Sequence, residues 1–304
     1  MLARLLRFTY LVQVLTGALI GTWGAVELAP KWGAASLGLI VLGGLGWVVF
    51  WQAVVIGLSM LKSRTQGLLG PWLKAASGEL MAALLIFGLR MPWTRTHPGV
   101  LLPTAQPAPG HTVLPVLLVH GFLCNHRVWD KVARALRQAG HPVLAIDLEP
   151  LFTSIDDYAP LVERAVAALR AQTGAPQVVL VGHSMGGLAV RAWLRRYGAQ
   201  HAAKIITLGT PHRGTQAPQW LSTPNGVQMK WRSVWLDELA RSETPDKRQL
   251  MHLALTHHDN IVYPQREQML DGATVTEFSG MGHLQMCLND GVISWLLRQV
   301  NAAK

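Results

Sequence analysis

Two long apolar stretches open the chain. The first runs from Phe8 to Leu28 and has Glu27 as its only charge, and the second runs from Ala34 to Leu61 with no charged residue. A helix of about 20 apolar residues crosses the hydrocarbon core of a bilayer. The link between the stretches is short, so they predict a transmembrane helical hairpin, with helices over residues 8–28 and 34–61.

A third apolar run is shorter. Leu80 to Leu89 lies between Glu79 and Arg90, and about ten apolar residues are too few to cross a bilayer easily. The run predicts an interfacial helix over residues 71–91. Residues 1–93 are therefore expected to form a membrane anchor.

Basic residues flank the apolar stretches unevenly. Two precede the first stretch and three follow the second, against one between them: Arg4, Arg7, Lys62, Arg64 and Lys74 against Lys31. The preference of cytoplasmic segments for Lys and Arg then places both ends of the hairpin in the cytoplasm. A cleaved signal peptide is the alternative for the first stretch, but its apolar core is too long and a second stretch follows. If the third run also crossed the membrane, the rest of the chain would be periplasmic.

The pattern changes after a connector over residues 94–114, which is rich in Pro and Gly and has no period. Such a composition predicts an extended linker. Beyond it, short runs of β-branched and other apolar residues alternate with helical patterns. These runs predict strands at 115–119, 143–146, 178–181, 204–208, 250–255 and 274–278. The alternation predicts an α/β domain over residues 115–304, with a mostly parallel sheet of about six strands flanked by helices.

Composition supports this division of the chain. Half of the residues are hydrophobic and 14% are charged. Residues 1–95 hold 8 Lys/Arg and 2 Asp/Glu, against 19 and 15 in residues 96–304, so the net charge of +10 divides into +6 and +4. The basic excess beside apolar segments favours anionic lipid headgroups over nucleic acid as its partner. The two cysteines, Cys124 and Cys287, are too few for a disulfide framework or a metal cluster. They are expected to be buried reduced thiols in a cytoplasmic domain, and a disulfide is an alternative only in a periplasmic one.

A strand, a sharp turn and a helix meet at Gly182-His183-Ser184-Met185-Gly186. A serine at such a turn presents its hydroxyl beyond the sheet, so Ser184 is the predicted nucleophile. The backbone N–H of Met185, at the start of a helix, is a predicted oxyanion donor. The loop after the first strand supplies the second predicted donor, the N–H of Phe122.

A serine nucleophile needs a base, and the base needs a carboxylate that orients it. His283 lies between the last predicted strand and the last predicted helix, and Asp259 directly follows a strand. They are the predicted base and carboxylate. The other acidic residues considered do not follow a clear strand: Asp237, Asp246 and Asp271.

Four motifs together resemble an α/β-hydrolase of the bacterial lipase and esterase group: His120-Gly121, Gly182 to Gly187, Thr210-Pro211-His212-Arg213-Gly214-Thr215, and Gly282-His283. The resemblance covers about residues 112–300. It implies ester hydrolysis through an acyl-enzyme without a cofactor, with Ser184, Asp259 and His283 as triad and Phe122 and Met185 as oxyanion donors. No Asp-rich calcium loop is evident, so no metal is predicted. The membrane hairpin departs from the secreted lipase pattern, and early antiparallel strands are not evident.

The segment over residues 215–248 falls between two strands, where a lid would lie above the serine. Its large side chains are Trp220, Met229, Trp231 and Trp235. An aromatic lid suits an apolar acyl chain. The alternative is a surface excursion packed by its own tryptophans.

The sequence as a whole predicts a membrane-anchored serine hydrolase that cleaves lipid or other acyl esters. The expected location is the bacterial inner membrane, crossed more than once, with the catalytic domain on the cytoplasmic side and no nucleic-acid partner. An acyltransferase or thioesterase with the same triad is one alternative, and an inactive hydrolase-fold scaffold is another. A transport role is disfavoured because the two long stretches contain no charge that would mark an ion or solute path.

Overall fold

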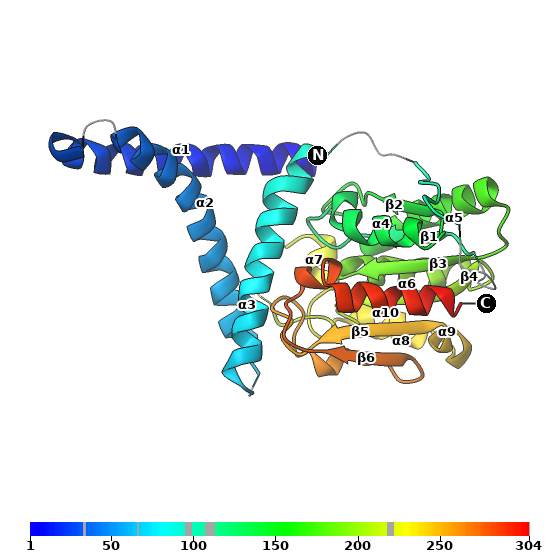
Figure 1. Cartoon of the computed structure of the whole chain (residues 1–304). Coiled ribbons are helices and arrows are strands. Elements are labelled where there is room, and N and C mark those ends of the chain that lie inside the picture. The colour runs from blue at the N-terminus through cyan, green and yellow to red at the C-terminus, as the bar shows by residue number, and fades with distance from the viewer. Residues whose placement is uncertain (33–34, 66, 95–98, 107–112, 218–221, 304) are drawn as a thin grey trace.

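A six-stranded sheet forms the centre of the second part of the chain (Figure 1). The computed structural model describes residues 1–32, 35–65, 67–94, 99–106, 113–217 and 222–303. All neighbouring strands pair in parallel, in the order β2-β1-β3-β4-β5-β6. The strands are β1 (Val116–Val119), β2 (Val143–Ile146), β3 (Val178–His183), β4 (Ala202–Leu208), β5 (Met251–Thr256) and β6 (Thr274–Phe278). The predicted fold class is confirmed, because the six runs of apolar residues are the six strands.

Helices cover both faces of the sheet because successive side chains of a strand point to opposite faces. In β1, Val116 and Leu118 pack into one core, and Leu117 and Val119 pack into the other. The first core is covered by α4 (Asp130–Gln138) and α10 (Asp290–Asn301). The second is covered by α5 (Ala159–Thr173), α6 (Met185–Tyr197) and α8 (Val234–Arg241). The short helices α7 (Pro224–Gln228) and α9 (Pro245–Gln249) complete the connection between β4 and β5.

The strand order creates a crevice at the carboxyl ends of the central strands. The chain passes from β1 to β2 on one side and then returns to β3 on the other, so the loops after β1 and β3 diverge. Val119 is the register partner of Gly182, and Gly182 is the partner of Thr207. Three loops therefore begin side by side at one edge of the sheet, which is where open α/β sheets bind ligands.

Three helices precede the sheet: α1 (Leu2–Trp32), α2 (Ala35–Lys62) and α3 (Leu69–Ala83). The last continues as a π-helix over Leu84–Arg90 and a 3₁₀ turn over Met91–Trp93. By length and composition, three segments could cross a membrane: Leu2–Glu27, Ile40–Lys62 and Leu69–Trp93. The third helix is longer than the apolar run in the sequence because it continues through both Glu79 and Arg90.

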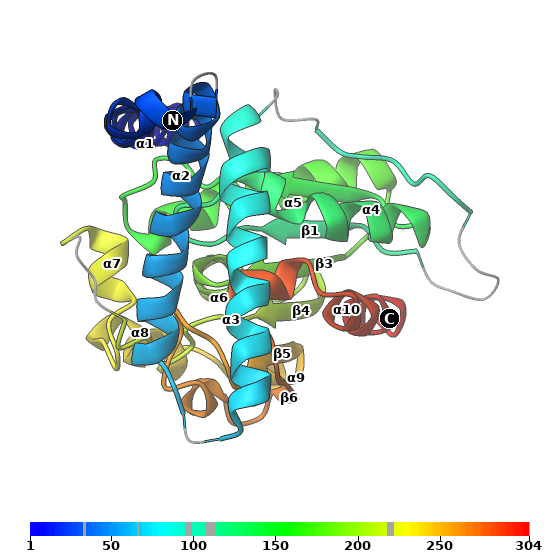
Figure 2. The same ribbon diagram turned by 60° about the vertical axis from the view of Figure 1, so that its left-hand side comes forward.

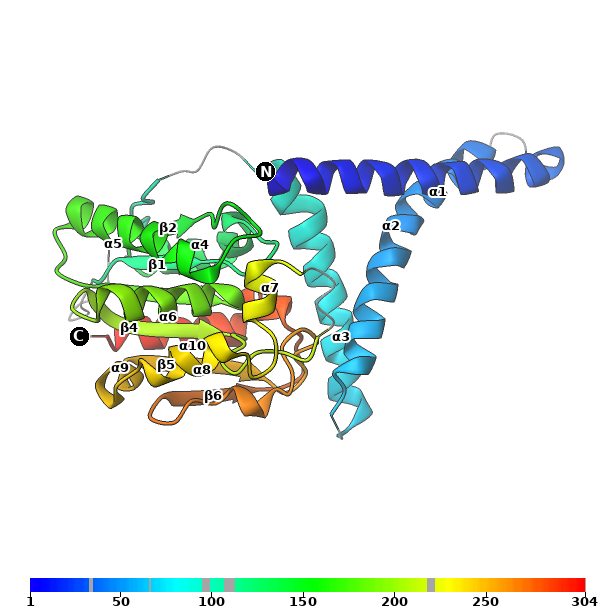
Figure 3. The same ribbon diagram turned by 180° about the vertical axis from the view of Figure 1, so that it is seen from behind.

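The first two helices pack on each other and project away from the sheet (Figures 1 and 3). They approach so closely that a Cβ on Gly17 would lie 2.5 Å from the carbonyl oxygen of Gly43, which is the close contact that small residues allow between apolar helices. Elsewhere the two helices leave large apolar side chains 62% to 72% exposed, among them Phe8, Leu19, Trp23, Leu42 and Leu58. In water these side chains would form an apolar surface of the kind that marks a membrane or partner contact.

The third helix lies instead against the domain that contains the sheet. It stands with the end of α2 across the carboxyl ends of the strands (Figures 1 and 2). Its residues Ala75, Ala82 and Ile86 belong to the same apolar core as α4 and α10. The linker also touches the sheet, because the backbone of Leu101 exchanges two hydrogen bonds with Val143 of β2, at 2.7 and 2.9 Å.

Candidate active site

Ser184 occupies the turn between β3 and α6, with backbone angles of φ 54° and ψ −128°. A residue other than glycine rarely adopts a positive φ, and such strain is typical of the turn that presents a nucleophilic serine. The neighbouring backbone makes the turn possible, since a Cβ on Gly186 would lie 2.2 Å from the carbonyl oxygen of Val119. The strand, the strained residue and the helix therefore follow the predicted order.

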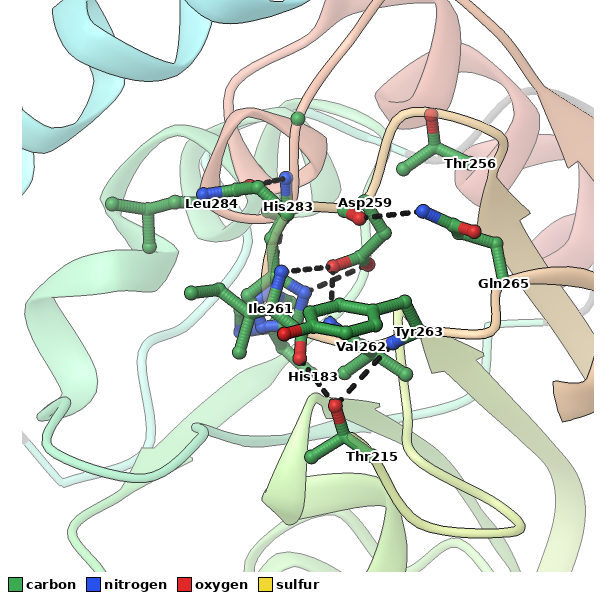
Figure 4. A network of polar contacts seen from close by, with 12 residues as sticks. His183, Thr215, Thr256, Asp259, Ile261, Val262, Tyr263, Gln265, His283 and Leu284 are labelled. Atoms are coloured by element: carbon green, nitrogen blue, oxygen red, sulfur yellow. Dashed lines mark hydrogen bonds and ion pairs between the residues drawn. The ribbon is translucent and has the colours of Figure 1, made fainter. Parts of the chain in front are cut away.

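Asp259 lies in the loop that follows β5, and His283 lies in the loop that follows β6. Their side chains contact each other. His283 Nδ1 lies 2.8 Å from Asp259 Oδ2, and both side chains are buried (Figure 4). The other carboxylate oxygen accepts the N–H groups of Ile261 and Val262, at 2.9 and 2.7 Å. Because the carboxylate is the acceptor, the proton of a neutral His283 ring belongs on Nδ1, and Nε2 is left free to accept a proton.

The electrostatic surroundings favour the protonated form of His283. Burial lowers the pKa of its imidazole, but the charge and hydrogen bond of Asp259, together with the charge of Glu79, raise it more, so the net shift is upward. A buried imidazole beside a fixed carboxylate can hold a proton taken from a nucleophile. The pair can therefore act as an oriented general base.

A second histidine packs against the first. The rings of His183 and His283 lie 4.6 Å apart between centroids, and His183 Nε2 donates to the backbone carbonyl of His283 at 3.2 Å. Burial holds the pKa of His183 well below its usual value, and the charge of His283 lowers it further. His183 is thus a neutral support for the histidine loop, a role that its place beside the serine in the sequence did not indicate.

Both predicted oxyanion donors lie next to Ser184. Met185 is the first residue of α6, and Phe122 lines the same cavity as Ser184. His120 braces the loop that carries Phe122, because its Nδ1 donates to the carbonyl of Gly121 at 2.8 Å and its Nε2 accepts the N–H of Leu148 at 2.9 Å. Burial lowers the pKa of His120, which keeps the ring neutral for this pair of bonds.

A carboxylate from α3 holds the histidine loop. Glu79 is buried, and its two oxygens accept the N–H groups of Leu284 and Gln285, each at 2.9 Å. These two residues directly follow His283. The sequence pattern marks Glu79 only as the border of an apolar run, although a lone carboxylate in such a run indicates a functional contact.

The second helix is tied to the carboxylate loop. Asn260, next to Asp259, donates from Nδ2 to Ser59 Oγ at 3.0 Å, and its Oδ1 accepts the N–H of His283 at 3.2 Å. Gln265 donates to the backbone carbonyl of Ser63 at 3.0 Å. Both loops that carry the predicted base and carboxylate therefore contact the N-terminal helices.

The motif from Thr210 to Thr215 supports the site through hydrogen bonds and does not line the cavity. Thr215 Oγ1 donates to the carbonyl of Ile261 at 2.6 Å and so holds the carboxylate loop (Figure 4). His212 is buried, with Nε2 2.9 Å from Thr207 Oγ1, and its carbonyl accepts a bond from Arg191 at 3.1 Å. Arg191 is in turn paired with Glu243 at 2.6 Å. The motif therefore joins the carboxylate loop to the body of the domain.

A cavity of about 290 Å³ lies at the predicted nucleophile. Its walls come from α2, from α3 and its π-helical extension, and from the loops after β1, β3, β5 and β6. The lining side chains and backbone belong to Gln52, Val55, Ile56, Ser59, Glu79, Ala83, Phe87, Gly121, Phe122, Leu123, Cys124, His183, Ser184, Asn260, Ile261, His283 and Leu284. A larger cavity of about 520 Å³ lies near Trp72 and Arg266, and neither Ser184 nor His283 lines it.

The family model described as alpha/beta hydrolase fold matches residues 115–278, which is more than half of the chain. The chain belongs to the α/β-hydrolase fold family.

Relatives of this α/β-hydrolase include ester-cleaving enzymes by name. The chain is 34% identical to a triacylglycerol lipase of Pseudarthrobacter phenanthrenivorans over 114 residues, which are 34% of this chain and 35% of the relative. It is 28% identical to methylesterase 3 of Arabidopsis thaliana over 138 residues, 43% of this chain and 52% of the relative. The chain thus spans about half or less of the length of these curated relatives.

A solved structure shares the fold. The mature form of Bacillus licheniformis lipase BlEst2 superposes with a TM-score of 0.55 at 18% identity, over 65% of this chain and 96% of that one. The superposition supports the fold alone.

Two further predictions concern residues near the cavity of this α/β-hydrolase. Cys124 and Cys287 are both buried free thiols, and burial raises the pKa of Cys124 to about 12. Such thiols are unreactive at neutral pH.

Among the described residues of the segment 215–248, none lines the cavity at Ser184, so its role as a lid stays a prediction.

Proposed function

We propose that the chain is a membrane-anchored serine hydrolase that cleaves carboxylic esters, with lipid or other acyl esters as its substrates. One observation carries the proposal: Ser184 and His283 line one cavity, and Asp259 orients the histidine from behind. The names of the relatives, a triacylglycerol lipase and a methylesterase, support an ester as the bond that is cleaved.

The proposed reaction proceeds through an acyl-enzyme. Ser184 Oγ attacks the ester carbonyl carbon while His283 Nε2 takes the hydroxyl proton, and the N–H groups of Phe122 and Met185 hold the oxyanion. His283 then gives its proton to the leaving alcohol as the carbon–oxygen bond breaks. Water repeats the sequence on the acyl-enzyme, which releases the acid and restores the serine.

The first test is hydrolysis of nitrophenyl esters from acetate to palmitate by the detergent-purified chain. We expect release of nitrophenolate, with an initial burst wherever hydrolysis of the acyl-enzyme is the slower step. Release that needs an added alcohol or thiol acceptor would favour an acyltransferase. Failure of the folded chain to release nitrophenolate at any length would contradict the proposal and favour an inactive scaffold.

We also propose that α1 and α2 cross the membrane and that α3 lies along its surface. Leu2, at the start of α1, is buried in the same apolar core as α4 and α10, which supports a start of α1 and a domain on the same side of the bilayer. Two crossings between them satisfy this, and three do not. The placement of Lys and Arg makes that side the cytoplasm of a bacterial inner membrane.

Reporter fusions test this topology. Alkaline phosphatase, which is active only outside the cytoplasm, is expected to be inactive when fused after Lys304. The matched control is the same reporter fused after residue 33, between the two crossings, where activity is expected. An active fusion after Lys304 would overturn the cytoplasmic assignment and would favour three crossings.

A further inference from the structure

We infer that α2 and α3 form the binding site for the acyl chain of a bilayer lipid ester, which reaches Ser184 between these two helices. The inference rests on the proposed role of Ser184 and adds the substrate's source and path. It makes the anchor a part of the substrate site.

The helices supply an apolar wall opposite the serine. Val55 and Ile56 of α2 face the cavity together with Ala83 and Phe87 of α3 and its extension. On the side of the catalytic domain, Phe122 continues the apolar surface. A wall of this kind matches a hydrocarbon chain and offers a polar substrate no partner.

The polar side chains that the helices bring to the cavity already have partners. Gln52 Nε2 donates to the hydroxyl of Tyr10 at 3.0 Å. Ser59 is bonded to Asn260, and Glu79 is bonded to the histidine loop. The bonds of Ser59 and Glu79 hold both helices against the loops of the site, so the wall keeps its position relative to Ser184.

The exposed residues at the rim of the cavity indicate that the acyl chain enters from the membrane. Val55 lines the cavity and yet is 59% exposed, and Ile261 on the opposite side is 40% exposed. Val55 belongs to a segment, Ile40–Lys62, that is long and apolar enough to cross a bilayer. An acyl chain can therefore pass from lipid to cavity along apolar surface without crossing water.

The wall is tested by adding bulk to it. Val55→Trp is expected to lower the ratio of kcat/KM for nitrophenyl palmitate to that for the acetate by at least about 10-fold, because a filled pocket excludes the longer chain. Ala83→Val adds less bulk, on the opposite helix, and is expected to lower the same ratio of kcat/KM values by a smaller factor. The matched control is Leu58→Trp, on the same helix and similarly exposed, at 62% against 59% for Val55, but outside the cavity lining. It should leave the ratio within about 2-fold. A ratio unchanged in both cavity variants would overturn the inference.

A binding experiment separates this inference from the proposed function. A palmitoyl ester that carries a diazirine on its acyl chain is placed in phosphatidylcholine vesicles with the full chain bearing Ser184→Ala, so that the ester stays intact. We expect crosslinks on α2 and on Leu69–Trp93. Crosslinks confined to residues 215–248, or none in the helices, would overturn the inference whether or not the wild-type chain hydrolyses esters. Binding from solution but not from vesicles would contradict the membrane path.

Discussion

Replacement of Ser184 by alanine is expected to lower kcat/KM for nitrophenyl esters by at least about 10⁴-fold. The variant keeps the cavity and the backbone N–H groups, but it has no oxygen that can form the acyl-enzyme. Alanine carries the same strain as serine at the positive φ of residue 184, because both have a Cβ atom. The fold is therefore expected to stay intact. Initial rates over the ester series, together with a thermal unfolding curve for each protein, measure both effects.

A covalent probe makes the test of Ser184 more specific. A fluorophosphonate should form one adduct on the wild-type chain, located at Ser184 by mass spectrometry, and none on the alanine variant. Ser222→Ala serves as the matched control, since Ser222 is exposed and should neither label nor change the rate. Undiminished hydrolysis or labelling by a folded Ser184→Ala protein would show that another group is the nucleophile.

The second large effect is expected from Asp259→Asn, which should lower kcat by about 10³- to 10⁴-fold. An amide can donate to His283 Nδ1, and this favours the tautomer whose Nε2 carries the proton and cannot act as a base. The variant also loses the charge that raises the pKa of His283. The wild-type rate falls as the pH drops through that raised pKa, so in the variant the acidic limb of the rate profile should move to lower pH.

The controls for this prediction are two acidic residues that do not follow a clear strand. Asp237 and Asp271 are exposed, and their replacement by asparagine should leave both the rate and the acidic limb unchanged. Stopped-flow or steady-state rates between about pH 5 and 9 resolve the limb. An equal loss in Asp271→Asn, or an acidic limb that stays in place in Asp259→Asn, would contradict the assignment of the carboxylate.

Local patterns in the sequence predicted the scaffold of the site. The six strands are runs of β-branched and other apolar residues, and the turn at Ser184 follows from glycines on both sides of a strand-to-helix junction. Asp259 and His283 could be placed because parallel strands bring their following loops to one edge. In each case the information lies within a few residues of the element concerned.

The contacts of Glu79 and Ser59 could not be predicted in this way. Glu79 is bonded to residues more than 200 positions later in the chain, and Ser59 contacts Asn260 at a similar separation. Such pairs depend on where the helices dock on the finished domain. The helix over residues 71–91 was predictable, but the two backbone N–H groups that bond to Glu79 within it were not.

The carboxylate on α3 limits how the N-terminal helices could be exchanged in evolution or in engineering. Another apolar helix docked in place of α3 would leave the buried N–H group of Leu284 and the partly buried N–H group of Gln285 without their acceptor. Each unpaired group costs about 1–3 kcal/mol, and both adjoin His283. Residues 94–304 are therefore not structurally independent of the N-terminal helices, because the loop that carries His283 depends on Glu79 of α3 for its hydrogen bonds.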